Sequence, residues 1–358
     1  MSLSIGIVGL PNVGKSTLFN ALTDAEALAA NYPFATIEPN TGIVPVPDER
    51  LQVLSKIYSS APIKPATVEF VDIAGLVAGA SQGEGLGNQF LANIRECDAI
   101  VHVVRSFENS DIVRHDDNQI DPRRDIDVIN TELVLADLQT LDKHLPKAQK
   151  EAESNPAKRA ELAQLERARE ILDTGVTLVA SSLELPKTLN LLSTKPVIYV
   201  FNIDEQTLAD PDKQASLQSL VSPAQAVFVC AKLEEELRGL DASDRQEILE
   251  SYGVKESGLV QLVHAAYSTL GLQSYLTAGD KEVRAWTTRQ GATAPEAAGV
   301  IHTDFEKGFI AAEVISYGDL AELGSELAVR QAGKSRTVGR DYTMQPDDVV
   351  EFRFNVTK

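Results

Sequence analysis

Residues 9–16 read Gly9-Leu10-Pro11-Asn12-Val13-Gly14-Lys15-Ser16. They match the pattern G-x-x-x-x-G-K-[ST] in full, after an apolar strand-like segment and before an amphipathic helical pattern that runs from Lys15 to Leu22. In this context the two glycines let the backbone curl, so that successive N–H groups and a helix N-terminus face a polyphosphate. The stretch therefore predicts a P-loop and, with it, an α/β fold.

The rest of the chain extends this fold class. Apolar, β-branched runs separated by helical patterns occur at Ser4–Val8, Val68–Val71, Ala99–Val104, Val197–Phe201 and Ala226–Cys230. Continuous apolar strands that alternate with helices are typical of a mostly parallel, doubly wound sheet covered on both faces. Since 358 residues exceed the usual size of one core, we expect more than one domain.

A stretch rich in Ala, Leu, Glu, Lys and Gln interrupts the α/β pattern and predicts a helical insertion over residues 127–195. Its apolar positions recur at helical spacing in two series: Val134, Leu138, Leu141 and Leu145, then Leu162, Leu165, Ala168 and Leu172. This pattern predicts an antiparallel helical hairpin with a narrow apolar seam. A structural spacer and a partner-binding arm are equally compatible with it.

From about Leu272 the pattern changes to short alternating segments with Gly and Asp turns, which predicts a small β-rich domain. The expected strands include Val283–Thr287, Gly308–Ala312 and Val349–Phe354. The predicted division is therefore a P-loop domain in two parts, 1–126 and 196–271, the helical insertion 127–195, and a C-terminal α+β domain, 272–358.

The phosphate-binding residues are expected to be Asn12, Val13, Gly14, Lys15, Ser16 and Thr17. Lys15 would place a positive charge near the β and γ phosphates, and the Ser16 hydroxyl would bind Mg²⁺. The strand from Thr67 to Val71 ends in Asp72-Ile73-Ala74-Gly75, where Asp72 can reach Mg²⁺ and the N–H of Gly75 can reach the γ phosphate. Thr36, in the polar loop between the two motifs, is the candidate switch residue for Mg²⁺.

Several motifs resemble the Obg-like subclass of translation-factor GTPases: Asn31-Tyr32-Pro33-Phe34, Asp72-Ile73-Ala74-Gly75-Leu76-Val77 and Gly83-Glu84-Gly85-Leu86-Gly87-Asn88. The helical insertion, Asn202-Ile203-Asp204-Glu205 and His302-Thr303-Asp304-Phe305 narrow the resemblance to the YchF group, the Obg-like ATPases. The resemblance covers essentially the whole chain. It implies an ATPase that requires Mg²⁺, a C-terminal TGS domain and association with ribosomes.

The base-reading motif favours ATP over GTP. GTPases use N-K-x-D there, whereas this chain has Ile203 in place of the lysine and Glu205 in place of the aspartate that binds guanine. Adenine could instead donate to Asn202, or to a carbonyl of the loop that contains Ala231 and Lys232, with Ile203 and Leu233 on either side of the ring. Two alternatives remain: a true GTPase in which Asp204 or Glu205 still reads guanine, and an Asn202 that only caps a helix.

Turnover is expected to be slow, because Leu76 follows Gly75 where Ras-type proteins place a glutamine that orients the attacking water. Asn12 could hold K⁺ against the phosphates. His115 is a candidate for positioning water, with Arg114 as a competing position and a solvated loop histidine as the simpler interpretation. A binding protein that uses nucleotide only to set its shape is therefore a further alternative.

The formal charge of -19 disfavours nucleic acid and anionic membranes as general partners. No apolar run is long enough to span a bilayer, so we expect a cytoplasmic protein with no membrane or DNA partner. One basic stretch, with Arg330, Lys334, Arg336 and Arg340, could contact ribosomal RNA. A solvated loop or edge strand would have the same composition.

Overall fold

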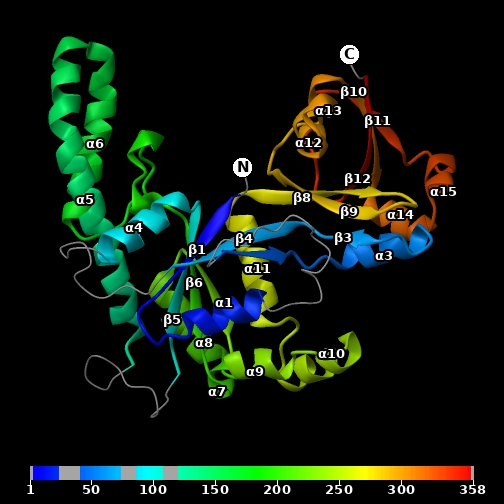
Figure 1. Cartoon of the computed structure of the whole chain (residues 1–358), viewed down its shortest axis with the longest axis horizontal. Helices are drawn as coiled ribbons and strands as arrows, with labels where there is room; N and C mark the ends of the chain where they lie inside the picture. The colour runs from blue at the N-terminus through cyan, green and yellow to red at the C-terminus, as the bar shows by residue number, and fades with distance from the viewer. Residues whose placement is uncertain (1–2, 24–40, 74–85, 108–119, 356–358) are drawn as a thin grey trace. The chain divides into compact units, whose positions relative to one another are not determined.

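The computed structural model describes residues 3–23, 41–73, 86–107 and 120–355. The chain divides into two compact units (Figure 1). The first unit contains Met1–Ile43 and Glu69–Ala266, and the second contains Val44–Val68 and Tyr267–Lys358. No helix among the described residues is both long enough and apolar enough to cross a membrane.

The first unit is built on a six-stranded sheet with the strand order β2-β4-β1-β5-β6-β7. The strands are β1 (Ser4–Val8), β2 (Thr41–Pro45), β4 (Thr67–Asp72), β5 (Ala99–Arg105), β6 (Val197–Asn202) and β7 (Gln225–Val229). The pairs β1–β4, β1–β5, β5–β6 and β6–β7 are all parallel. The predicted mostly parallel P-loop sheet is therefore confirmed, and the carboxyl ends of β1, β4 and β6 lie at the same edge of it.

Helices cover this sheet through two apolar clusters. The first cluster joins Val8 and Ile100 of the sheet to α4 (Leu86–Glu96) and to the first half of α5 (Pro122–Ser154). The second joins Phe201 and its neighbours to side chains near α8 (Pro211–Val221), α9 (Ala231–Glu236) and α10 (Ala242–Ser251). The remaining helices of this unit are α1 (Lys15–Thr23), α7 (Glu205–Leu208) and α11 (Gly258–Thr269).

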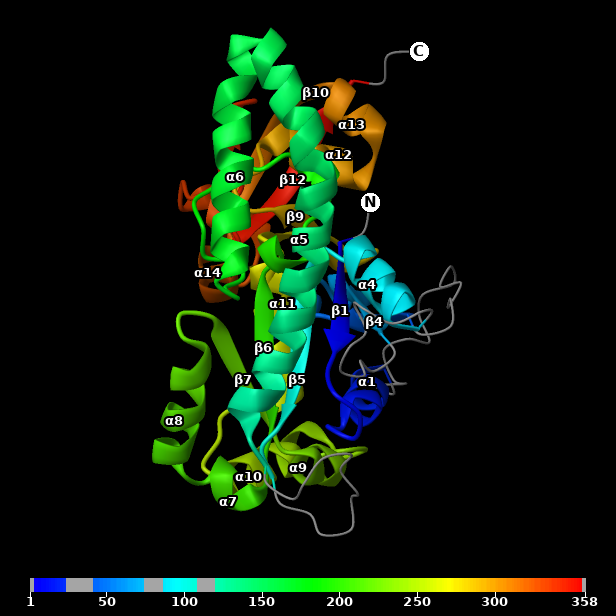
Figure 2. The ribbon, with the colours of Figure 1, turned by 90° about the vertical axis from the view of Figure 1, so that its left-hand side faces the viewer.

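The helical hairpin consists of α5 and α6 (Arg159–Asp173), which lie side by side in both views (Figures 1 and 2). All eight positions of the predicted seam belong to one apolar cluster, so the hairpin prediction is confirmed. However, α5 begins at Pro122 and its first turns, with Ile129 and Leu133, pack on the sheet. The expected boundary at residue 127 therefore falls inside a continuous helix.

A buried carboxylate on α5 anchors the segment that leads from the hairpin back to the sheet. Asp137 of α5 is fully buried and accepts hydrogen bonds from the backbone N–H groups of Leu192 and Ser193, both at 2.8 Å, and from the Ser193 hydroxyl at 2.6 Å. Burial raises the pKa of Asp137, while these donors act to lower it. Three donors on one carboxylate fix where the insertion ends and β6 begins.

The second unit contains a six-stranded sheet with the order β11-β10-β12-β8-β9-β3. Its strands are β3 (Ile63–Lys64), β8 (Leu272–Ala278), β9 (Val283–Arg289), β10 (Phe309–Ser316), β11 (Arg336–Val338) and β12 (Asp348–Phe354). Its helices are α3 (Glu49–Ile57), α12 (Ala294–Ile301), α13 (Thr303–Lys307), α14 (Tyr317–Leu323) and α15 (Glu326–Gln331). The three strands expected after residue 272 are present, which confirms the β-rich C-terminal domain.

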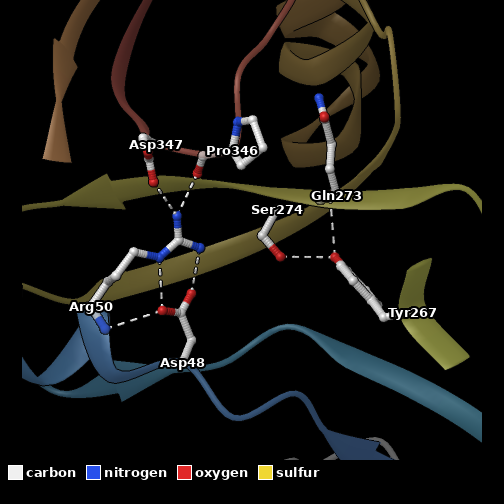
Figure 3. Close-up of polar contacts among 7 residues, drawn as sticks. All are labelled: Asp48, Arg50, Tyr267, Gln273, Ser274, Pro346 and Asp347. Atoms are coloured by element: carbon white, nitrogen blue, oxygen red, sulfur yellow. Dashed lines mark hydrogen bonds and ion pairs between the residues drawn. The ribbon is translucent and has the colours of Figure 1, made fainter. Parts of the chain in front are cut away.

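The segment Val44–Val68 corrects the expected domain division, which placed it in the first part of the P-loop domain. β3 pairs in parallel with β9, and α3 packs against β9 and α14 through a face that includes Leu51 and Leu54. Figure 3 shows Arg50 of α3 bound to the loop that contains Pro346 and Asp347. A local apolar pattern indicates a buried helix face but not which unit covers it, so the sequence alone could not assign this segment.

Candidate functional site

The loop between β1 and α1 is tightly curled. A Cβ atom on Gly9 would lie 2.8 Å from the carbonyl oxygen of Val103, and one on Gly14 would lie 2.4 Å from Nδ2 of Asn202. Gly14 and Asn12 also have positive φ angles, 95° and 64°. The loop thus requires glycine at both motif positions, because a side chain there would collide with the neighbouring strands.

Lys15 and Asp72 meet at the carboxyl edge of the sheet. The Lys15 ammonium lies 3.0 Å from Oδ1 of Asp72, with 11% and 18% of the two side chains exposed. Asp72 reaches this place because it is the last residue of β4, in register with Ile7 of β1. The two motifs are 57 positions apart in the sequence but supply one cation and one carboxylate to the same point.

This arrangement fits a magnesium-bound polyphosphate. Ser16 and Thr17 are exposed on the first turn of α1, so their hydroxyl groups are accessible beside the Lys15–Asp72 pair. Within the described ranges no three His, Cys, Asp or Glu side chains form a metal cluster. The Ser16 hydroxyl and the Asp72 carboxylate, together with phosphate oxygens and water, would offer a divalent ion the oxygen ligands that Mg²⁺ prefers.

Asn202, in the segment predicted to read the base, contacts the loop between β1 and α1. Its Nδ2 atom donates to the carbonyl oxygen of Val13 at 3.1 Å, and the side chain is buried. Asn202 does not cap α7, because that role belongs to Asp204, whose carboxylate accepts from the backbone N–H of Thr207 at 2.8 Å. The alternative in which Asn202 serves only as a helix cap is therefore wrong.

Ile203 and Leu233 are oriented differently from the expectation that they enclose a base. Each is 2% exposed and belongs to the apolar cluster around Phe201, together with Cys230. The backbone N–H of Ile203 donates to the carbonyl oxygen of Val229 at 2.9 Å, which places the residue in the sheet edge. Both side chains therefore pack into the core beneath the two loops. At this edge Ala231 and Lys232 are exposed, and Glu205 is partly exposed.

Four of the predicted site residues, Thr36, Gly75, Leu76 and His115, lie outside the described residues, as does Arg114. Their roles stay predictions. The described candidates Asn12 to Thr17, Asp72 and Asn202 come together at the carboxyl edge of the sheet, joined by the contacts Lys15–Asp72 and Asn202–Val13.

The basic stretch in the second unit is largely neutralised by its surroundings. Arg330 forms ion pairs with Glu313, Glu326 and Glu351, and Lys334 forms ion pairs with Asp319 and Glu322. Arg336 lies 5.9 Å from the centre of the Tyr342 ring, and Arg340 donates to the carbonyl oxygen of Phe309 at 3.4 Å. Among the described residues, neither Arg336 nor Arg340 forms an ion pair, so these two carry most of the available charge.

Two contacts at this edge were missed by sequence reasoning: the capping role of Asp204 and the ion pair between Glu205 and Lys232. The first had a signal, because Asp directly before a short helical segment is typical of an N-cap. The second had none, because the partners are 27 positions apart and belong to different strand–helix units.

Family models match both ends of the chain. The model MMR_HSR1, described as a 50S ribosome-binding GTPase, matches residues 4–136. The model YchF-GTPase_C, described as a protein of unknown function (DUF933), matches residues 272–355.

Full-length relatives are similar across the whole chain. The protein named ribosome-binding ATPase YchF from Haemophilus influenzae is 52% identical over 364 residues, which cover 99% of this chain and 100% of the relative. The protein of the same name from Bacillus subtilis is 47% identical over 367 residues, with the same coverage. The solved structure of the Schizosaccharomyces pombe YchF GTPase is 37% identical, covers 98% of both chains and superposes with a TM-score of 0.86.

Proposed function

Because the chain belongs to the YchF family, we propose that it binds ATP with Mg²⁺, hydrolyses it slowly and associates with ribosomes. The observation that carries this proposal is the Lys15–Asp72 pair beside the curled loop. A cation for phosphate and a carboxylate for a divalent ion lie 3.0 Å apart, where the backbone N–H groups of the loop can reach the same ligand.

In the proposed mechanism Lys15 exchanges its partner when a nucleotide enters. Its ammonium would leave Asp72 for the β and γ phosphate oxygens, and Asp72 and Ser16 would then be available to hold Mg²⁺. When bound, Mg²⁺ supplies positive charge that offsets the negative charge of the transferring phosphoryl group. The loop between Gly9 and Gly14 orients the phosphates through its N–H groups, and Asn202 keeps that loop in place through Val13.

The occupied carboxylates at the base-reading edge support ATP as the preferred nucleotide. Asp204 caps α7 through Oδ1, and Glu205 is paired with Lys232, so both carboxylates are already engaged and are weaker acceptors for the paired N–H groups of guanine. The backbone carbonyls and the side-chain oxygen of Asn202 remain as acceptors for the amino group of adenine. Leu76 has no polar group with which to orient the attacking water, so we expect slow turnover. If hydrolysis depends on K⁺, Asn12 is the residue proposed to hold that ion.

We place the activity on the ribosome in the cytoplasm, as a nucleotide-driven switch that regulates translation or a stress response. The printed names of the relatives support the ribosome as partner. A direct contact with ribosomal RNA would use Arg336 and Arg340, because Arg330 and Lys334 are already paired with carboxylates.

Two experiments distinguish this proposal from its alternatives. Competition of ATP and GTP for a fluorescent ADP analogue should show tighter binding of ATP, whereas a true GTPase of the Obg class would bind GTP more tightly. Single-turnover hydrolysis with and without ribosomes should show cleavage of bound ATP. A nucleotide-gated binding protein would cleave none in either condition.

A further inference from the structure

The loops that follow β6 and β7 share one edge of the sheet. β6 and β7 are neighbouring parallel strands, and Asn202 is in register with Val229. α7 begins at Glu205, three residues after β6 ends, and α9 begins at Ala231, two residues after β7 ends. Side chains of the first turns of α7 and α9 are thereby brought together next to Asn202, the residue that contacts the phosphate loop.

Both carboxylates at this edge have partners. Asp204 accepts from the backbone N–H of Thr207. Burial acts to raise the pKa of Asp204, but hydrogen bonds from Thr207 and the charge of Lys213 hold it below the ordinary value. Glu205 forms an ion pair and hydrogen bond with the ammonium of Lys232. Its side chain is 37% exposed and that of Lys232 is 63% exposed, so a ligand can reach both.

We propose that Lys232 is a specificity-determining residue: by binding the carboxylate of Glu205 it selectively lowers the affinity of the site for guanine nucleotides. The inference rests on the proposed function. A carboxylate recognises guanine by accepting two adjacent N–H groups, at N1 and N2, which uses both of its oxygens. Because Lys232 occupies Oε1 of Glu205 and offsets its charge, guanine must displace the ammonium before it can bind in this way.

Adenine is not affected in the same manner, because it lacks the paired N–H groups and presents a single amino group beside a ring acceptor. The ion pair therefore discriminates by withholding an acceptor that only guanine needs. An exposed ion pair is weak, so its removal should change the selectivity only modestly, by about threefold to fivefold.

The test uses the full-length protein and competition of ATP and GTP against a fluorescent ADP analogue. Lys232→Met removes the charge but keeps most of the apolar stem. We expect the ratio of GTP affinity to ATP affinity to rise about threefold to fivefold. Raising the salt concentration to about 1 M, where charges are screened within roughly 3 Å, should shift this ratio in the same direction for the wild type but not for the variant.

Two further variants show whether the effect passes through Glu205. Lys147→Met removes another exposed lysine, paired with Glu151 within α5, and should leave the ratio unchanged. In Lys232→Met/Glu205→Gln the gain should disappear, because the freed carboxylate is no longer present. An unchanged ratio in Lys232→Met, or a gain that persists without Glu205, would overturn the inference. A wild type that prefers GTP would instead refute the proposed function.

Discussion

The guanidinium of Arg50 donates to the carboxylate of Asp347 at 2.9 Å, across 297 positions of the sequence. The same group donates to the carbonyl oxygen of Pro346 at 2.7 Å and binds both carboxylate oxygens of Asp48 (Figure 3). Nearby, the Tyr267 hydroxyl hydrogen-bonds the Ser274 hydroxyl at 2.9 Å. Arg50 therefore fastens the segment Val44–Val68 to the C-terminal part of the second unit.

Replacing Arg50 by methionine should destabilise the second unit. Asp48 is only 11% exposed and would lose its cation, at a cost on the order of 1 to 3 kcal/mol in the free energy of unfolding. Urea denaturation followed by the fluorescence of Trp286, the single tryptophan of the chain, reports on β9 directly. Arg167→Met removes a fully surface pair with Glu170 and serves as the control. Equal midpoints for the two variants would contradict the assigned role of Arg50.

Replacing Lys15 by alanine should abolish nucleotide binding or hydrolysis while the fold remains intact. The proposed mechanism requires the ammonium at the phosphates. Asp72, 18% exposed, loses its cation in this variant, so we expect a lower stability but not an unfolded sheet. Titration with the fluorescent ADP analogue measures the loss, circular dichroism checks the fold, and Lys213→Ala is the matched control. Unchanged affinity in Lys15→Ala would remove the basis of the site.

Acid should destabilise the protein through His102. This side chain of β5 is 1% exposed, and burial lowers its pKa to about 3, so the folded protein keeps it neutral. The unfolded chain binds a proton near pH 6.5, and stability is therefore lost as the pH falls below that value. This one group should account for about 2 kcal/mol of the stability lost between pH 7 and pH 5.

The matching variant is His102→Leu, compared with the wild type by urea denaturation at both pH values. Nε2 of His102 has no hydrogen-bond partner within the described part of the chain, so leucine leaves no donor or acceptor unsatisfied there. The variant should lose less stability than the wild type between pH 7 and pH 5. An identical loss would show that other groups govern the acid response.

Neutralising Arg336 and Arg340 together should weaken co-sedimentation with ribosomes more than neutralising Arg330 and Lys334. The first pair forms no ion pair among the described residues, whereas the second is engaged with carboxylates such as Glu313 and Asp319. Glutamine at each position removes the charge and keeps a polar side chain, and the dependence on salt concentration measures the number of phosphate contacts. Equal losses from the two double variants would argue against an RNA contact through Arg336 and Arg340.

Local signals predicted most of the first unit. The P-loop depends on glycines and a lysine within eight residues, and the hairpin seam depends on spacings of three and four, so both can be read along the chain. The strands β1, β5 and β6 are continuous apolar runs, which explains why a mostly parallel sheet could be predicted.

What the sequence did not show depends on contacts between distant residues. The partners of Arg330 and Lys334 lie on β10, α14, α15 and β12, so a stretch without acidic residues seemed to be a free basic patch. Ile203 follows a buried strand, and its packing inside the sheet edge depends on Cys230 and Leu233 from the next strand–helix unit. Neither these ion pairs nor the packing of Ile203 produces a pattern that can be read from neighbouring residues in the sequence.

The origin of β3 and α3 bears on how this protein can be dissected. A fragment that starts at residue 272 has the full family match of 272–355, yet it lacks the strand that pairs with β9 and the helix that contributes Leu51 and Leu54. Such a fragment would expose an unpaired strand edge and an apolar face, both of which promote aggregation. A fragment made by a single truncation therefore lacks part of the unit. A soluble version would need residues 44–68 fused to it through a linker.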